Sequence, residues 1–245
     1  ATAMLISDNQ LALDDTLADY FPELVGRIEY ADRITLGMLL QHRSGIPDWI
    51  EDPDFPWTTS LENVNEYLEL VLDDPAEFEP GSRYAYSNTN YLLIGDILDK
   101  TLGYHHQQYI QSEVLAPLGL TNTFGALSDV DTTEVSSGYY TEYHADVKML
   151  DVVVPGGSMI ATAEDTGLFL RALNDGSLFD EDEQDLYSSI YVYEHTGLWP
   201  GYSSIARYYE DLDAVVIQFV NTSGGNSWMI SEIVYNRIVR ILRKQ

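Results

Sequence analysis

The stretch SIARYYEDLDAVVIQFV, residues 204–220, decides the fold class. Residues 204–209 and 214–220 are rich in β-branched and aromatic side chains, which favour strands. The mostly acidic stretch EDLD, residues 210–213, lies between them and fits the turn of an antiparallel hairpin. Residues 189–193 have the same strand-like character. We therefore predict a small antiparallel sheet near the C-terminus.

Helical periodicity flanks this sheet on both sides. Residues 91–102 form an apolar pattern that ends at Gly103, a typical residue after a helix C-terminus. Thr162 opens a further helix with a capping-box pattern that runs to Asn174. A last helix is predicted over residues 228–242. The side chains that we expect this last helix to turn inward are Met229, Ile230, Ile233, Val234, Ile238 and Ile241.

The order of these elements predicts an α+β fold, because helices come first and are followed by strands and a closing helix. No Gly/Ser linker, low-complexity tract or repeat divides the chain. We therefore predict a single domain over residues 1–245, mostly helical over about 15–160, with the antiparallel strands and the C-terminal helix in 161–245. A sheet of two or three strands is thin for this length, so further strands are expected on the N-terminal side.

Composition excludes several classes of function. The chain of 245 residues carries 40 acidic and 12 basic residues, a net charge of −28, which disfavours nucleic acid and anionic membranes as partners. The absence of cysteine excludes disulfides, a thiol nucleophile and Cys-ligated zinc. No apolar run approaches the ~18–20 residues of a membrane span. The acidity fits either adaptation to salt or an ordinary acidic secreted protein.

Common catalytic and cofactor motifs are absent from the sequence, including Gly-x-Ser-x-Gly, His-Glu-x-x-His and the phosphate-binding Gly-x-x-x-x-Gly-Lys. His105 and His106 are adjacent, so on a helix they could not face one metal, and we expect surface positions. Residues 180–183 are all acidic but lack the glycine and ligand spacing of a calcium loop, which predicts a solvated acidic turn. We expect no metal and no cofactor.

Two segments stand out as candidates for chemistry. The first is PGSRYAYSNTNY, residues 80–91, where Tyr86 and Asn88 precede the apolar helix. The second is HTGLWPGYSS, residues 195–204, directly before the strand-like stretch. Both segments also have a purely structural interpretation. Asn88 could be only a helix cap, because asparagine is common at that position, and His195-Thr196-Gly197 could be only a hairpin turn.

Together these segments resemble the second and third motifs of the serine β-lactamase-like family, which includes class C β-lactamases, D-alanyl-D-alanine carboxypeptidases and related esterases. Residues 34–47 (ITLGMLLQHRSGIP) and 156–165 also resemble stretches of that family, in the same order. The resemblance implies a β-lactamase/transpeptidase-like fold, with an antiparallel sheet flanked by helices and a helical subdomain. It also implies a periplasmic or extracellular location.

The family's nucleophile lies in a Ser-x-x-Lys motif, which this sequence lacks. The residues three before its only lysines are Ile97, Ala145 and Ile241. In similar proteins the motif directly precedes a helix that aligns with residues 1–5, which lie within the helix-like stretch 1–7. We therefore expect the serine and the first strands to lie upstream, in a missing N-terminal segment. The other interpretation is a protein that has lost its nucleophile.

The resemblance implies acyl transfer through an acyl-enzyme, with a role for each matching residue. Tyr86 would shuttle the proton, and Asn88 would orient the lysine and the substrate amide. The backbone N–H of Leu198 would supply half of the oxyanion hole. His195 is a further catalytic match, and the remaining matches, which would bind substrate, are Thr196, Gly197 and Trp199. Trp199 either lines an apolar acyl pocket or packs as an ordinary core residue.

His195 narrows the implied substrate. Histidine has an ordinary pKa of about 6.5, so it is mostly neutral above pH 7 and pairs only intermittently with a substrate carboxylate. This favours a peptidase or esterase acting on small-molecule or peptide amides and esters over an efficient β-lactamase. The alternative from another class is a non-catalytic binding or scaffold protein on the same fold.

Overall fold

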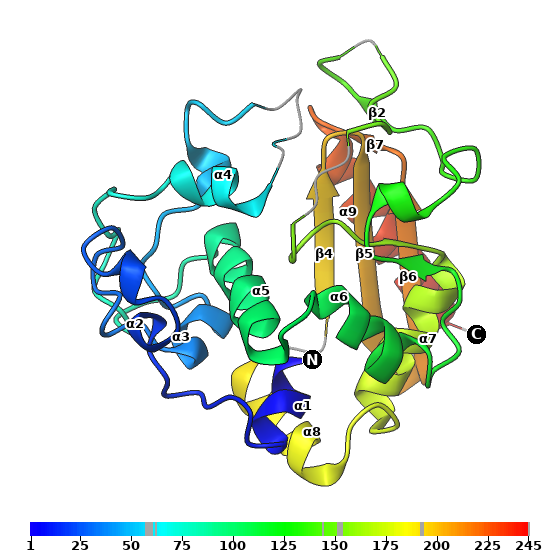
Figure 1. The fold of residues 1–245 in the computed structure, drawn as a ribbon. Helices are drawn as coiled ribbons and strands as arrows, with labels where there is room; N and C mark the ends of the chain where they lie inside the picture. The colour runs from blue at the N-terminus through cyan, green and yellow to red at the C-terminus, as the bar shows by residue number, and fades with distance from the viewer. Residues whose placement is uncertain (57–60, 62, 144, 151–153, 192–193, 245) are drawn as a thin grey trace. The chain divides into compact units, whose positions relative to one another are not determined.

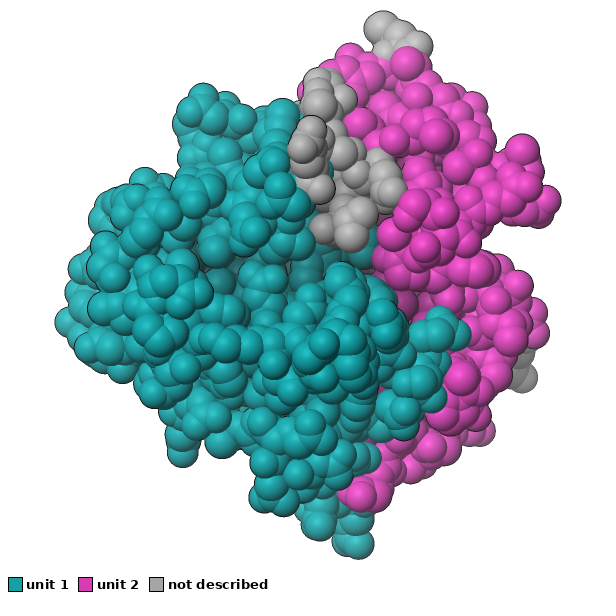
Figure 2. Space-filling model, in the orientation of Figure 1, with its two compact units in different colours: residues 1–113, 152–158, 181–191 teal, residues 114–151, 159–180, 192–245 magenta. Residues whose placement is uncertain are grey.

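The computed structural model describes residues 1–56, 61, 63–143, 145–150, 154–191 and 194–244. Two compact units make up the chain, and each draws on several stretches of the sequence (Figure 2). The first comprises residues 1–113, 152–158 and 181–191, and the second comprises residues 114–151, 159–180 and 192–245. The single domain expected over residues 1–245 stays a prediction.

Helices dominate the first unit. Its longest helix, α5, covers Asn88–Leu102 and ends as predicted at Gly103, which takes a left-handed φ of 75°. Leu93 and Ile97 on its inner side are fully buried. The other helices here, including the predicted N-terminal one, are α1 (Thr2–Ser7), α2 (Leu17–Tyr20), η1 (Pro22–Leu24), α3 (Leu36–Leu40), η2 (Trp49–Glu51), α4 (Val64–Glu69), α6 (His106–Tyr109) and α8 (Glu181–Ile190), and the π-helical turn η3 (Ile110–Leu115) follows α6.

The second unit is built on an antiparallel sheet in the order β4-β5-β6 (Figure 1). Its strands are β4 (His195–Trp199), β5 (Tyr202–Tyr209) and β6 (Ala214–Val220), so the predicted hairpin across residues 210–213 is confirmed. Two short pairs accompany it, β1 with β3 antiparallel and β2 with β7 parallel. The other elements of this unit are β1 (Thr123–Phe124), η4 (Leu127–Asp129), β2 (Tyr139–Tyr140), β3 (Ile160–Ala161), α7 (Ala163–Asp175), η5 (Glu210–Leu212), β7 (Thr222–Ser223) and α9 (Ser227–Leu242).

Helices α7 and α9 cover opposite faces of this sheet (Figure 1). A Cβ added to Gly167 of α7 would lie 3.3 Å from the side chain of Ile217. The neighbouring Val216 packs instead against Tyr235 and Val239 of α9. Because successive strand residues point to opposite faces, the sheet is enclosed between the two helices. Mixed helices and antiparallel strands confirm the predicted α+β class.

The face of α9 that meets the sheet is not the predicted one. Tyr235 and Val239, four residues apart, are 1% and 4% exposed. The residues predicted to point inward, which are Met229, Ile230, Ile233, Val234, Ile238 and Ile241, are instead 38–59% exposed. The helix is apolar around much of its circumference, so periodicity did not identify the side in contact with the sheet. No helix in the described part of the chain has the length and apolarity to cross a bilayer.

Helix α8 replaces two predicted elements. The acidic turn expected over residues 180–183 and the strand expected over 189–193 are wrong, because α8 runs from Glu181 to Ile190. The acidic residues occupy the first helical turn, where negative charge interacts favourably with the helix N-terminus. Residues 192 and 193 of the expected strand lie outside the described residues.

A buried carboxylate anchors the start of α7. Thr162 is the N-cap, as predicted, and its hydroxyl accepts the N–H of Asp165 at 3.2 Å. The Asp165 side chain accepts the backbone N–H of Asn122 at 2.8 Å and the hydroxyl of Thr123 at 2.9 Å. Asp165 is only 4% exposed and Thr123 only 9% exposed, so water cannot easily replace the carboxylate as the acceptor for the Thr123 hydroxyl.

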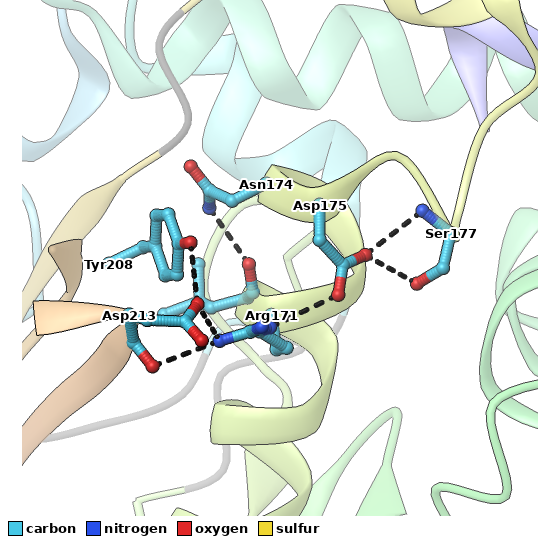
Figure 3. Close-up of polar contacts among 7 residues, drawn as sticks. Arg171, Asn174, Asp175, Ser177, Tyr208 and Asp213 are labelled. Carbon is cyan, nitrogen blue, oxygen red and sulfur yellow. Dashed lines mark hydrogen bonds and ion pairs between the residues drawn. The ribbon is translucent and has the colours of Figure 1, made fainter. Parts of the chain in front are cut away.

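An exposed cluster ties the other end of α7 to the sheet (Figure 3). The Arg171 guanidinium pairs with Asp175 at 3.1 Å and with Asp213 at 2.6 Å, and it lies over the Tyr208 ring. The Tyr208 hydroxyl donates to Asp213 at 3.1 Å. Because Arg171 is 39% exposed, water competes for each of these contacts.

Because the contacts at one end of α7 are buried and those at the other end are exposed, we expect substitutions at the two ends to lower the free energy of unfolding by different amounts. We expect Asp165→Ala to lower the free energy of unfolding by about 2–3 kcal/mol, because the buried Thr123 hydroxyl and the partly buried Asn122 N–H lose their acceptor. Arg171→Ala should lower it much less, because its partners are solvated. Urea denaturation of both variants measures the difference, and equal losses would contradict burial as the determining factor.

Candidate active site

Tyr86 and Asn88 lie where the chain enters α5. Ser87 holds the N-cap position in an extended conformation, and Asn88 is the first helical residue. The interpretation of Asn88 as only a helix cap is therefore wrong. The Tyr86 hydroxyl donates to Asn88 Oδ1 at 3.5 Å, and Asn88 Nδ2 donates to Asp48 Oδ2 at 2.8 Å. The side chain of Asn88 thus joins a phenol to a carboxylate.

A fully buried histidine, His42, supports this segment. Its Nδ1 accepts the backbone N–H of Ser87 at 3.2 Å and lies 3.3 Å from Asn90 Nδ2. Its ring packs against those of Tyr86 and Tyr91, with centroids 4.2 and 5.2 Å away. His42 therefore holds both the backbone of the motif and the ring plane of Tyr86.

The electrostatic surroundings keep Tyr86 protonated. Although Tyr86 is 44% exposed, partial desolvation of its ring, followed by the nearby Tyr191, Asp48 and Tyr84, raises its pKa to about 12. At neutral pH the phenol is then a proton donor rather than a base. A cation close to its oxygen would favour the phenolate and lower the pKa.

The second predicted motif forms β4, the outer strand of the sheet. The interpretation of His-Thr-Gly as a hairpin turn is wrong, because the turn to β5 is made by Pro200 and Gly201. Gly201 has a φ of 88°, and a Cβ there would lie 2.4 Å from the side chain of Val147. Only glycine fits this turn without displacing its neighbours.

The backbone of Leu198 faces the outer edge of β4. In a two-residue hairpin the pair that flanks the turn is hydrogen-bonded, here Trp199 with Tyr202, and bonded and non-bonded pairs alternate along the strands. The N–H of Leu198 therefore points away from β5, toward an edge that no described strand pairs with. A carbonyl oxygen brought to this edge would meet a backbone donor. The Leu198 side chain is 61% exposed.

The other motif residues lie along the same strand. Gly197 is opposite Ser204, and a Cβ on Gly197 would lie 2.4 Å from the Ser204 hydroxyl. His195 is exposed, with Nδ1 2.5 Å from the Thr196 carbonyl oxygen. Thr196 and Trp199 are half-buried. This stretch gives a ligand access to both backbone and side chains.

The structure places the predicted site residues in two groups. Tyr86 and Asn88 lie in the first unit, and residues 195–199 lie in the second. Convergence of the two groups on one cleft stays a prediction. His42 and Asp48 had no predicted role. The sequence did contain a signal for a role of these two residues. His42 lies within the stretch 34–47 that resembles the family, and Asp48 directly follows it.

One cluster of possible metal ligands occurs among the described residues, formed by Asp99, His105 and His106 within 4.8 Å of one another. His105 is exposed as predicted, but the prediction of a surface position is wrong for His106, which is 4% exposed. Asp99 Oδ1 lies 2.8 Å from His106 Nδ1 and accepts the His106 backbone N–H at 2.5 Å. The imidazoles stack with centroids 4.5 Å apart, so their nitrogen lone pairs do not converge. The arrangement fits a structural link between α5 and α6.

Comparison with known proteins places these motifs in context. Residues 1–189 match the family model described as Beta-lactamase. A putative D-alanyl-D-alanine carboxypeptidase from Escherichia coli (strain K12) is 30% identical over a match that covers 50% of this chain and 30% of that protein. The chain thus matches less than a third of the length of such curated relatives.

Solved structures share the fold. The D-amino acid amidase from Ochrobactrum anthropi SV3, complexed with D-phenylalanine, has a TM-score of 0.83 at 22% identity and covers 98% of this chain and 87% of its own. A penicillin-binding protein from Bacillus halodurans has a TM-score of 0.76 at 21% identity, covering 95% of this chain and 80% of its own. The predicted β-lactamase/transpeptidase-like fold is confirmed.

Tyr86 generates a prediction about pH. In the 245-residue chain we expect its phenol to titrate near a pKa of about 12, rather than near the ordinary value of about 10. Because the folded-state pKa is raised, its contribution to stability is complete below pH ~10 and is lost as the pH rises toward 12. NMR titration of ¹³Cζ-labelled tyrosine, assigned with Tyr86→Phe, measures this pKa, and an ordinary value would contradict the burial effect.

Proposed function

Because the chain belongs to the Beta-lactamase family, we propose that it carries the second and third active-site motifs of a serine hydrolase working through an acyl-enzyme. The observation that carries the proposal is that each motif presents a group that acyl transfer needs. A phenol contacts an orienting amide at the start of α5, and a backbone donor faces the open edge of β4. Proton transfer and stabilisation of an oxyanion require these kinds of groups.

The proposed reaction uses these groups in a defined order. A serine hydroxyl attacks the carbonyl carbon of an amide or ester, and Tyr86 takes its proton. The negative oxygen of the tetrahedral intermediate accepts the N–H of Leu198 and that of the serine. Tyr86 then passes the proton to the leaving amine or alcohol, and water repeats the sequence on the acyl-enzyme. Asn88 orients the lysine and the substrate amide, while the residues that bind substrate are His195, Thr196, Gly197 and Trp199.

The serine and its lysine, in this proposal, come from polypeptide outside the 245 residues. No Ser-x-x-Lys occurs in the sequence, and the curated relatives are much longer than the matched stretch. The high pKa of Tyr86 supports the same idea, because a phenol with a pKa of about 12 needs a neighbouring cation to act as a base. A lysine of the missing motif would provide that charge.

Two uncovered surfaces of the second unit also support additional polypeptide. The outer edge of β6 has no partner strand in the described part of the chain, and Phe219 on it is 46% exposed. Beside it, α9 exposes a broad apolar face that includes Ile230 and Ile233. Proteins normally cover or interrupt such strand edges and patches. Strands next to β6 and a helix on α9 would cover both.

The proposed substrates are small amides or esters of D-amino acids, including D-alanyl peptides. The names of the relatives support this class, because they include D-alanyl-D-alanine carboxypeptidases and a D-amino acid amidase. His195 supports peptidase or esterase activity over efficient β-lactam hydrolysis, because it provides a weaker partner for a substrate carboxylate than lysine. We place the reaction outside the cytoplasm.

The alternative is a non-catalytic binding protein that uses the same two motifs. The absence of Ser-x-x-Lys from this sequence favours it. The two functions differ in one chemical property, which is the ability to form a covalent acyl adduct.

Acylation tests the proposal directly. We expect the protein with its native upstream segment to gain the mass of a penicillin or fluorophosphonate adduct on the serine of a Ser-x-x-Lys motif. Tyr86→Phe should slow acylation by about 10²- to 10⁴-fold, because the proton carrier is lost. Tyr104→Phe, at an exposed tyrosine just after the C-terminus of α5, is the matched control and should acylate at the wild-type rate. A folded protein that forms no adduct would support the binding function instead.

Replacement of the histidine tests the substrate class. We expect His195→Lys to raise kcat/KM for acyl donors that carry a carboxylate, such as penicillins, because lysine keeps its charge above pH 7. Neutral ester substrates should gain nothing. Steady-state kinetics with both kinds of substrate at pH 8 measure the ratio, and an equal change for both would argue against contact between this side chain and the carboxylate.

A further inference from the structure

We propose that Asp48 is a positioning residue that holds the side-chain amide of Asn88 with its carbonyl oxygen toward the Tyr86 hydroxyl. This inference rests on the proposed hydrolase function, because the orientation matters only if Tyr86 and Asn88 take part in acyl transfer. Asp48 itself does not touch the reacting atoms in this scheme. It acts through Asn88.

The chemistry of the contact determines the orientation of the amide. An ionised carboxylate can only accept hydrogen bonds, so the Asn88 group that faces Asp48 Oδ2 at 2.8 Å must be the NH₂. The other end of the amide, Oδ1, is then the end 3.5 Å from the Tyr86 hydroxyl. An asparagine without such a neighbour could present either end to the phenol. Asp48 removes that choice.

Asp48 holds Asn88 at two points. Hydrogen bonds from the side chain and the backbone N–H of Asn88 favour the ionised form of Asp48 and oppose the larger rise in its pKa that burial causes. Because this backbone N–H lies at the N-terminus of α5, the helix dipole adds a favourable interaction with the carboxylate. With its backbone and its amide both held, Asn88 has few alternative side-chain conformations.

Asp48 is itself fixed by its surroundings. Its side chain caps η2 by accepting the backbone N–H of Ile50 at 3.3 Å. On either side of Asp48, the backbone is tied to Thr89, which accepts the N–H of Trp49 at 3.1 Å and donates its hydroxyl to the Pro47 carbonyl at 2.6 Å. The carboxylate therefore cannot move away from the start of α5 without breaking these bonds. A rigid support of this kind suits a residue that must aim another side chain.

Burial of Asp48 has a cost that a surface cap would avoid. Desolvation is the largest influence on this group and raises its pKa, against the hydrogen bonds from Asn88 and Ile50. The bond from Ile50 is explained fully if Asp48 only caps η2. Such a cap does not require contact with Asn88. The test must therefore separate capping from orientation.

Asp48→Asn makes this separation, because the new side chain keeps the size and an acceptor for the cap. Its amide both donates and accepts, so it satisfies Asn88 in either orientation, and a fraction of molecules would turn the NH₂ toward Tyr86. In the protein with its native upstream segment we expect kcat to fall by about 10- to 100-fold with little change in KM. Asp48→Glu, which remains acceptor-only, should recover part of the loss.

Glu51→Gln is the matched control. It removes a negative charge from the same short helix at an exposed position. Because the Glu51 charge raises the pKa of Asp48, its loss keeps Asp48 ionised, and kcat should stay unchanged. If Asp48→Asn and Glu51→Gln have the same kcat, and Asp48→Asn differs only in thermal stability, then Asp48 is a structural cap and the proposal is overturned.

A second measurement does not depend on activity. In the 245-residue chain, the side-chain ¹⁵N–¹H₂ group of Asn88, assigned with Asn88→Asp, should give one pair of resonances with one strongly hydrogen-bonded proton. Asp48→Asn should shift or split this pair, and Glu51→Gln should not. An unchanged amide in Asp48→Asn would overturn the proposal even in an active enzyme. If the Asn88 amide responds to Asp48→Asn as expected but the protein has no hydrolase activity, only the proposed function is wrong and the positioning role of Asp48 stands.

Discussion

The first motif depends on one constraint, which is that leaving a buried polar group at the start of α5 without its hydrogen-bond partner is costly. Ser44 donates to Asn90 Oδ1 at 2.6 Å, and Asn90 Nδ2 lies 3.3 Å from the Nδ1 of His42 that also accepts the Ser87 N–H. All of these groups are buried, so a shift of the backbone at Ser87 would leave at least one of them unpaired. The loop that carries Tyr86 therefore has one favourable arrangement.

The second motif depends on the opposite condition. A backbone N–H that is to bind a substrate oxygen must not be used within the protein, and the edge of β4 leaves it unused. What keeps this edge in place is the turn that follows it. The Ser223 hydroxyl accepts the N–H of Gly201 at 2.8 Å and donates to the carbonyl of Trp199 at 2.6 Å. One buried side chain thus fixes the turn while the strand edge stays open.

Local signals predicted an element correctly wherever several of them agreed. Apolar periodicity and Gly103 defined the end of α5, and the cap at Thr162 defined the start of α7. The strand expected over residues 189–193 failed because its β-branched and aromatic side chains follow an acidic helical turn, and helix formation continued to Ile190. Propensity alone could not rank these competing signals. Burial of His106 was missed because its partner, Asp99, lies on the preceding helix.

The sequence by itself determined the family, the order of the motifs and the residue types available for chemistry, because these depend only on spacing along the chain. The tertiary structure decided which face of α9 is buried and how Asn88 is oriented. Asp48 and Asn88 are 40 residues apart, and no periodic pattern connects them. A hydrogen bond has a direction, and that direction exists only after two distant segments have packed together.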